Sequence, residues 1–134
     1  MQSTAKWEDE FRSTVDNGRN HMVTVDLPKQ KNGSDSGPTA LEMTLMGLSG
    51  CISTIFAMIA ANSKVDFDKL IVHAEDKSPE NVPTFSSIKI EVQVKSSQSE
   101  EKLQKILKKT TATCPVELLF EAAGVNIDSV LIKI

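Results

Sequence analysis

The spacing of the apolar residues changes several times along this chain, and each spacing predicts a different element. From Met22 to Leu27, and again from Ile88 to Val94, apolar and polar residues alternate, which is typical of half-buried strands. Residues 39–62 are apolar around most of a helix circumference, which is typical of a buried helix. Residues 99–112 carry one apolar stripe among charges and predict an amphipathic surface helix.

The remaining segments are shorter and are bounded by turn residues. Asp16-Asn17-Gly18 is a turn signal, so residues 5–27 predict a hairpin in which residues 5–12 form the first strand. The segment from Pro28 to Gly37 is polar and predicts a flexible loop. The other expected elements are a strand over 70–74, a charged loop over 76–83, a short helix that Pro115 starts and Gly124 closes, and one or two strand pieces over 125–134.

Helix signals support both long helices. Thr39 with Glu42 three residues later is a capping-box pattern, and Ser97 with Glu100 is another. Gly47 and Gly50 are poor helix residues, so we expect them to let another backbone come close.

The order of elements is strand, strand, helix, strand, strand, helix, helix, strand. This order predicts an α+β fold in which antiparallel sheet packs on helices, formed by one domain over residues 1–134. The helix at 39–62 is too apolar for one sheet face to cover. We therefore expect a homodimer that buries the remainder.

Composition excludes several classes of protein. The net charge is −3 over 134 residues, and the aromatic residues are five Phe and one Trp. Nucleic-acid binding needs a basic excess and rings for stacking, so we expect no nucleic-acid partner. The apolar stretch Leu45–Ala61 is interrupted by polar residues and falls short of the ~20 residues of a membrane span. The first twelve residues lack the apolar run of a secretion signal, which favours a cytoplasmic protein with reduced thiols.

Two cysteines are candidates for chemistry, and local physics leaves the role of each open. Cys51 lies in the middle of a helix without a charged helical neighbour. It is therefore either a small buried apolar residue or a thiol that a cation from another part of the fold activates. Cys114 precedes Pro115 at a helix start, where the helix N-terminus favours a thiolate and Glu117 opposes it. By local reasoning Cys114 is the better thiolate. The two are 63 residues apart, which is no metal-ligand spacing, and we expect no metal site.

Three motifs resemble one known family over essentially the whole chain. The segment from Gly37 to Cys51 resembles the signature G-P-x-x-x-E-x-x-L-x-x-L-x-x-C, and Cys114-Pro115-Val116 resembles a second-cysteine motif. Between them, residues 83–88 resemble a strand entry of the form P-x-aromatic-x-x-I. These motifs are typical of the family of osmotically inducible protein C and the organic hydroperoxide resistance proteins.

The resemblance implies an intertwined homodimer with long central helices back to back between sheets. It implies a cysteine peroxidase that acts on organic hydroperoxides, in which Cys51 attacks the peroxide and Cys114 resolves the sulfenic acid as a disulfide. An external dithiol, of the lipoyl type in part of the family, reduces that disulfide, and no bound cofactor is needed. The resemblance also implies an activating arginine in the N-terminal hairpin, here Arg19 or Arg12 with Arg19 preferred, oriented by Glu42.

A second hypothesis keeps the same fold without catalysis. The chain would then be a dimeric stress protein or small-ligand binding protein whose thiols are inert. The reactivity of the two thiols toward a peroxide or a reactive disulfide separates the two hypotheses.

Overall fold

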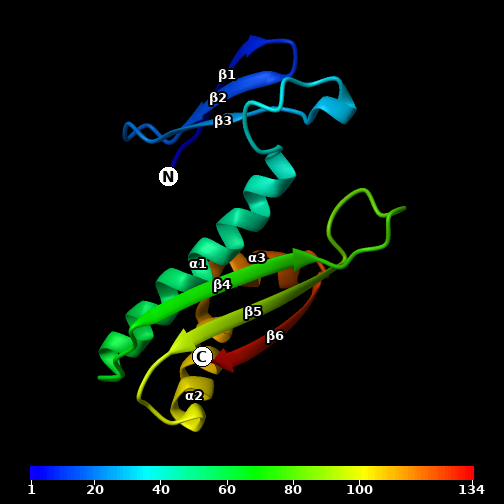
Figure 1. Cartoon of the computed structure of the whole chain (residues 1–134). Helices are drawn as coiled ribbons and strands as arrows, with labels where there is room; N and C mark the ends of the chain where they lie inside the picture. The colour runs from blue at the N-terminus through cyan, green and yellow to red at the C-terminus, as the bar shows by residue number, and fades with distance from the viewer. The chain divides into compact units, whose positions relative to one another are not determined.

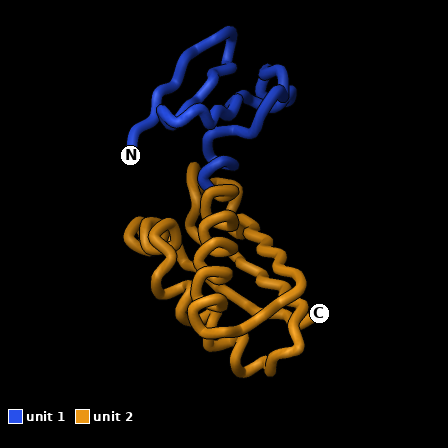
Figure 2. Tube along the Cα trace, turned by 90° about the vertical axis from the view of Figure 1, so that its left-hand side faces the viewer, with its two compact units in different colours: residues 1–44 blue, residues 45–134 orange.

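The computed structural model describes all residues from Met1 to Ile134, and they form two compact units. Residues 1–44 make the first unit and residues 45–134 the second, coloured separately in Figure 2. The three helices and two small sheets confirm the predicted α+β class. The single domain expected over residues 1–134 stays a prediction.

The first unit holds a three-stranded antiparallel sheet in the order β1-β2-β3 (Figure 1). Its strands are β1 (Thr4–Asp9), β2 (Arg12–Asp16) and β3 (Met22–Val25). The predicted strand over 5–12 is wrong, because the chain turns at Glu10, which has a φ of 45°. Residues 5–27 therefore form three strands instead of a two-stranded hairpin, and Arg12 opens β2 instead of ending β1.

The buried side chain of Asp26 forms hydrogen bonds that stabilise the loop after β3. Asp26 is 3% exposed, and its carboxylate accepts hydrogen bonds from the Leu27 amide at 2.8 Å and from the Ser36 amide and hydroxyl at 3.1 and 2.8 Å. These bonds, led by the Ser36 amide, lower the pKa of Asp26. The loop expected here includes one short 3-10 turn, η1 (Lys29–Lys31).

The long helix α1 (Ala40–Asn62) begins with the predicted capping box. The Thr39 amide donates to Glu42 Oε2 at 2.7 Å, and the Glu42 amide donates to Thr39 Oγ1 at 3.1 Å. The two side chains thus satisfy helix-start amides that have no partner inside the helix. The bonds from Thr39 also lower the pKa of Glu42.

The second unit is built on a mixed sheet in the order β4-β5-β6. Its strands are β4 (Lys69–Asp76), β5 (Ser87–Lys95) and β6 (Asn126–Lys133). β4 and β5 are antiparallel as expected, whereas β5 and β6 are parallel. The parallel pair is possible because α2 (Glu100–Thr113) and α3 (Pro115–Ala122) form a long crossover between the two strands.

The helices pack on one face of this sheet (Figure 1). The predicted alternation of β5 is confirmed, since its apolar side chains are at most 1% exposed while Lys89, Glu91 and Lys95 point the other way. The buried core joins the β5 residues to one stripe of α1 and to α2. Its largest fully buried apolar members are Leu48, Ile52, Phe56, Ile88, Ile90, Val92, Val94 and Leu103.

The opposite side of α1 is apolar and uncovered in a single chain. Met46 and Met58 are 58% and 52% exposed. A Cβ built on Gly47 or Gly50 would meet nothing within 4 Å, so no backbone of this chain approaches either glycine. The close approach expected at these glycines stays a prediction.

Helix α1 is also longer than the apolar stretch Leu45–Ala61 from which a membrane span was judged too short. With 23 residues it is long and apolar enough to cross a membrane by length and composition, so the expectation that this stretch is too short is wrong. Core helices of water-soluble proteins have the same length and composition. Here α1 buries Leu48, Ile52 and Phe56 against the sheet.

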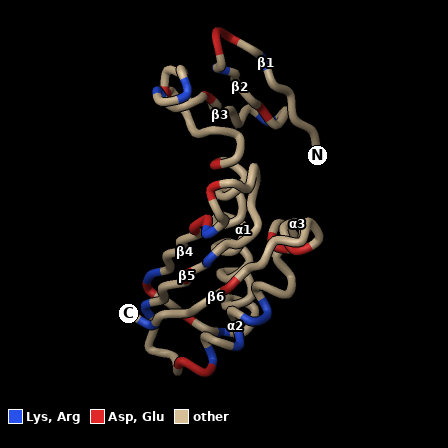
Figure 3. The backbone as a smooth tube through the Cα atoms, turned by 90° about the vertical axis from the view of Figure 1, so that its right-hand side faces the viewer, with Lys and Arg blue, Asp and Glu red and all other residues tan.

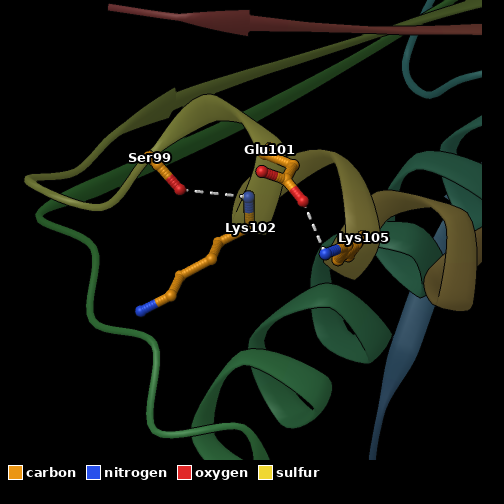
Figure 4. Close-up of polar contacts among 4 residues, drawn as sticks. All are labelled: Ser99, Glu101, Lys102 and Lys105. Carbon is orange, nitrogen blue, oxygen red and sulfur yellow. Dashed lines mark hydrogen bonds and ion pairs between the residues drawn. The ribbon is translucent and has the colours of Figure 1, made fainter.

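The start of α2 differs from the predicted capping box at Ser97 and Glu100. The N-cap is Ser99, whose hydroxyl accepts from the Lys102 amide at 3.4 Å (Figure 4). In the next turn Lys105 pairs with Glu101 at 2.7 Å. The N-cap lies two residues later than predicted because the residues before Ser99 still close the end of β5. There the Ser96 hydroxyl donates a hydrogen bond to the Asp66 carbonyl at 2.6 Å.

Candidate redox site

The second unit brings the two cysteines together. Cys51 lies in the middle of α1, and Cys114 joins α2 to α3, yet the Cys51 thiol is close enough to raise the pKa of the Cys114 thiol. Both are free thiols. Cys114 is fully buried, and Cys51 is partly buried and packs against the core. A pair that the sequence separates by 63 residues is therefore adjacent in the fold.

The backbone explains why Cys114 lies at this point. Its amide donates to the Thr110 carbonyl at 2.8 Å and ends α2, while its carbonyl accepts from the Leu118 amide at 3.0 Å and begins α3. Pro115 stands at the first position of α3 and forces Cys114 into extended geometry, with φ −67° and ψ 111°. The bend between the two helices turns the Cys114 side chain into the core.

Burial has the largest effect on the pKa of the Cys114 thiol. It raises the pKa of the thiol to about 11, and the neighbouring Cys51 thiol adds to the rise. The amides of Glu117 and Val116 act in the opposite direction, but Cys114 makes no side-chain capping hydrogen bond. The prediction that the helix start makes Cys114 the better thiolate is therefore wrong, because loss of solvation outweighs the helix amides.

Glu117 is a further functional candidate at the start of α3 that the sequence did not single out. Glu117, in the first turn of α3, is 3% exposed, and its Oε2 is buried without a hydrogen-bond partner. Burial raises the pKa of this carboxyl to about 7, and repulsion by Glu121 contributes. The sequence held a signal, because Glu117 lies three residues before the buried Phe120 and so shares its helix face.

The other predicted site residues belong to the first unit. Arg19 is exposed in the turn between β2 and β3, where its amide donates to Asn17 Oδ1 at 2.9 Å. Arg12 is half-buried at the start of β2, opposite Asp9. Glu42 is engaged in the capping box with Thr39. The roles assigned to Arg19, Arg12 and Glu42 stay predictions.

The site has the parts of a dithiol–disulfide couple. Two free thiols in contact can be oxidised to a disulfide once one of them carries a leaving group. No three His, Cys, Asp or Glu side chains gather as the ligands of a metal ion would. The chemistry that this arrangement offers is therefore that of sulfur, with Glu117 as the adjacent ionisable group.

The comparisons with known proteins identify the family and the fold of this chain. The sequence model of the OsmC-like protein family matches residues 33–130. No curated protein matches the chain. An OsmC-like protein from Mycoplasma pneumoniae has a similar structure, with a TM-score of 0.85 at 17% identity over 99% of this chain and 96% of that one.

Two further solved structures carry names that refer to peroxides. One is an organic hydroperoxide resistance protein OsmC from Legionella pneumophila, with a TM-score of 0.69 at 12% identity over 99% of this chain and 96% of that one. The other is an organic hydroperoxide resistance protein from Elizabethkingia anophelis, with a TM-score of 0.74 at 15% identity over 98% and 94%. At these identities the likeness shows the fold. Because the family match covers most of the chain, this protein belongs to the OsmC-like family.

Proposed function

We propose that the protein is a thiol-dependent peroxidase that reduces organic hydroperoxides with Cys51 and Cys114. The proximity of the two thiols in the fold carries this proposal, because a resolving thiol must reach the sulfur that the peroxide oxidises. The apolar side chains around Cys51, including Leu48 and Ile55, favour an alkyl peroxide over hydrogen peroxide. The names of the solved relatives point to the same class of substrate.

The proposed cycle needs only the two sulfurs and an external dithiol. The thiolate of Cys51 attacks the terminal peroxide oxygen, the O–O bond breaks, and the alkoxide takes a proton and leaves as an alcohol. Cys51 is then a sulfenic acid. Cys114 attacks its sulfur, a disulfide forms and water leaves. A dithiol, of the lipoyl type or another, reduces the disulfide by thiol–disulfide exchange. No bound cofactor takes part.

We propose that Cys51 attacks and Cys114 resolves because their surroundings differ. Cys51 is partly exposed, so a peroxide can approach it, whereas Cys114 is fully buried and its raised pKa makes it a poor first nucleophile. A partly buried thiolate at Cys51 needs a cation, and we assign this role to Arg19, with Arg12 as the alternative and Glu42 as the orienting acid. Arg19→Lys should then slow peroxide reduction more than Arg12→Lys.

We further propose that the protein acts as a cytoplasmic homodimer. The apolar side of α1 that a single chain leaves uncovered, with Met46, Met58 and the two open glycines, supports a second copy at this surface. Sedimentation equilibrium tests the assembly directly. A monomer at micromolar concentration would contradict it.

Stopped-flow consumption of cumene hydroperoxide in the presence of a dithiol tests the activity. With the dithiol, wild-type protein should turn over many equivalents of peroxide and Cys51→Ser none. Without the dithiol, Cys114→Ser should consume one equivalent and keep Cys51 as a sulfenic acid. The two serine variants are matched, because each removes one sulfur of the same pair. Peroxide consumption by the wild type no faster than by Cys51→Ser would overturn the proposal.

The second candidate is a small-ligand binding protein with inert thiols. Full burial of Cys114 and its raised pKa favour it, since such a thiol is unreactive without help. A reactive aromatic disulfide distinguishes the two candidates. Rapid modification of Cys51 followed by formation of the internal disulfide excludes inert thiols, whereas two thiols that react only after unfolding support the binding protein.

A further inference from the structure

The resolving step requires removal of the proton from the Cys114 thiol, and neither cysteine can accept it. Cys114 can attack only after its sulfur has lost a proton. With a pKa of about 11, about one thiol in ten thousand is ionised at pH 7. Fast disulfide formation therefore requires a base within the buried site.

One carboxyl belongs to the same helix start as Cys114, and its Oε2 is free of hydrogen bonds. Glu117 is one helical turn from Cys114, and its backbone amide faces the Cys114 sulfur. Its side chain is 3% exposed, and no hydrogen bond holds Oε2. A buried carboxyl without a partner costs free energy, and groups of this kind gather at functional sites.

The surroundings bring the pKa of this carboxyl close to physiological pH. Its pKa is raised to about 7 by burial first and by Glu121 second. Helix α3 carries acidic residues and no Lys or Arg (Figure 3), and no charged side chain of the neighbouring α2 or β6 lowers the pKa of Glu117. A group with a pKa near the working pH is the best general acid and base, since both of its forms are populated.

We propose that Glu117 accepts the proton of Cys114 during disulfide formation and returns it to the hydroxide that leaves Cys51. The inference rests on the proposed peroxidase cycle. Glu117 as carboxylate takes the proton from the Cys114 thiol, and the resulting thiolate attacks the sulfur of the Cys51 sulfenic acid. The S–S bond forms as the S–O bond breaks. Hydroxide leaves with the Glu117 proton as water, so the thiol is oxidised, the sulfenic sulfur is reduced, and Glu117 is a carboxylate again.

The other polar groups near Cys114 are less suited to this role. The Thr110 hydroxyl is buried, but it donates to the Ile106 carbonyl at 2.9 Å and has no basicity at neutral pH. Glu121 is exposed to solvent. Glu117 is the buried carboxyl of the second unit, and rotation of its side chain breaks no hydrogen bond at Oε2.

A reaction that needs no peroxide tests the proposal separately from the peroxidase function. One equivalent of 5,5′-dithiobis(2-nitrobenzoic acid) forms a mixed disulfide at Cys51 and releases one coloured thiolate. Cys114 then attacks the mixed disulfide and releases the second. The second release measures ionisation and attack of Cys114, since its leaving group needs no proton.

We expect Glu117→Gln to slow the second release about 100-fold at pH 7 and to leave the first unchanged. In the wild type the second release should increase with pH and level off above about pH 7, whereas in Glu117→Gln it should keep rising toward pH 11. Glu121→Gln is the matched control on the same helix. It should keep the wild-type rate on the plateau and shift the midpoint to lower pH, because it removes the repulsion at Glu117.

The proposal is overturned if folded Glu117→Gln shows the wild-type rate and pH profile in the second release. Glu117→Met removes the carboxyl with similar volume and gives the same test if the amide is poorly tolerated. A two-phase release that depends on Glu117, in a protein that consumes no cumene hydroperoxide, would refute the peroxidase function and retain the role of Glu117.

Discussion

The buried carboxyl of Glu117 should make the stability of this protein fall as the pH rises. Its pKa increases from the ordinary 4.5 to about 7 on folding, so the native state binds more protons than the unfolded state between these values. The free energy of unfolding therefore decreases with pH across this interval. Below about pH 4.5 the carboxyl is protonated in both states, and above about pH 7 it is charged in both, so the full penalty is present at pH 8.

The size of the penalty follows from the change in pKa. The rise from 4.5 to about 7 corresponds to about 3.4 kcal/mol at 1.36 kcal/mol per factor of ten in proton affinity. The first turn of α3 borders on solvent, and screening there reduces the expected value to about 2 kcal/mol. Glu117→Gln has nearly the same shape and cannot ionise. It should therefore be more stable than the wild type by about 2 kcal/mol at pH 8 and nearly equal at pH 4.

Urea unfolding at the two pH values measures this difference, with the protein concentration held fixed because association would shift the midpoints. The dependence of unfolding free energy on urea should be the same for both proteins, which shows that only stability has changed. Glu121→Gln serves as the control for removing an exposed negative charge. A Glu117→Gln variant that differs from the wild type equally at pH 4 and pH 8, or that is less stable at pH 8, would refute the account of a buried and charged Glu117.

Three further predictions concern stability and assembly. Asp26→Asn should be less stable than the wild type at pH 7 in urea unfolding, with the gap closing as the pH falls below 3.8, because the lowered pKa of Asp26 stabilises the fold only while the carboxylate is charged. Thr39→Ala removes the cap of α1 and should cost about 1 kcal/mol in thermal unfolding, and an unchanged melting temperature would contradict the capping role. A Cβ at Gly47 meets nothing within 4 Å, so in sedimentation equilibrium Gly47→Leu should weaken a dimer built on this helix face, and undiminished association would exclude that face.

The sequence predicted the regular elements well where their patterns are local. The alternation from Ile88 to Val94 and the capping box of Thr39 and Glu42 both appear in the structure as expected. Such features depend on residues within one or two turns of each other, so a linear pattern contains them. The α+β class followed from the order of these elements.

The sequence predictions failed where a distant contact decides between local options. Residues 5–12 look like one strand, but pairing of Trp7 with Ser13 requires a turn at Glu10. The sequence pattern predicted a helix start at Ser97, whereas Ser96 closes the end of β5 and the helix is capped by Ser99. The parallel pairing of β5 with β6 likewise depends on where α2 and α3 pack, which no periodicity reveals.

The candidate site was only partly predictable for the same reason. The motif resemblance pointed to Cys51 and Cys114, and the fold makes them neighbours. Their ionisation was not predictable from their neighbours in sequence. A helix start lowers the pKa of a thiol when solvent or a full cap completes the site, whereas Cys114 has a core around it.

The same burial explains how the two thiols can divide the work. A resolving thiol that ionised freely would compete with Cys51 for the peroxide, and a pKa of about 11 prevents this. That protection also slows resolution unless a base acts only inside the site. Glu117 satisfies both conditions, because the core that silences Cys114 also brings the carboxyl to a pKa of about 7. Burial at the start of α3 thus suppresses attack of Cys114 on the peroxide. The same burial gives Glu117 the pKa that lets it assist disulfide formation.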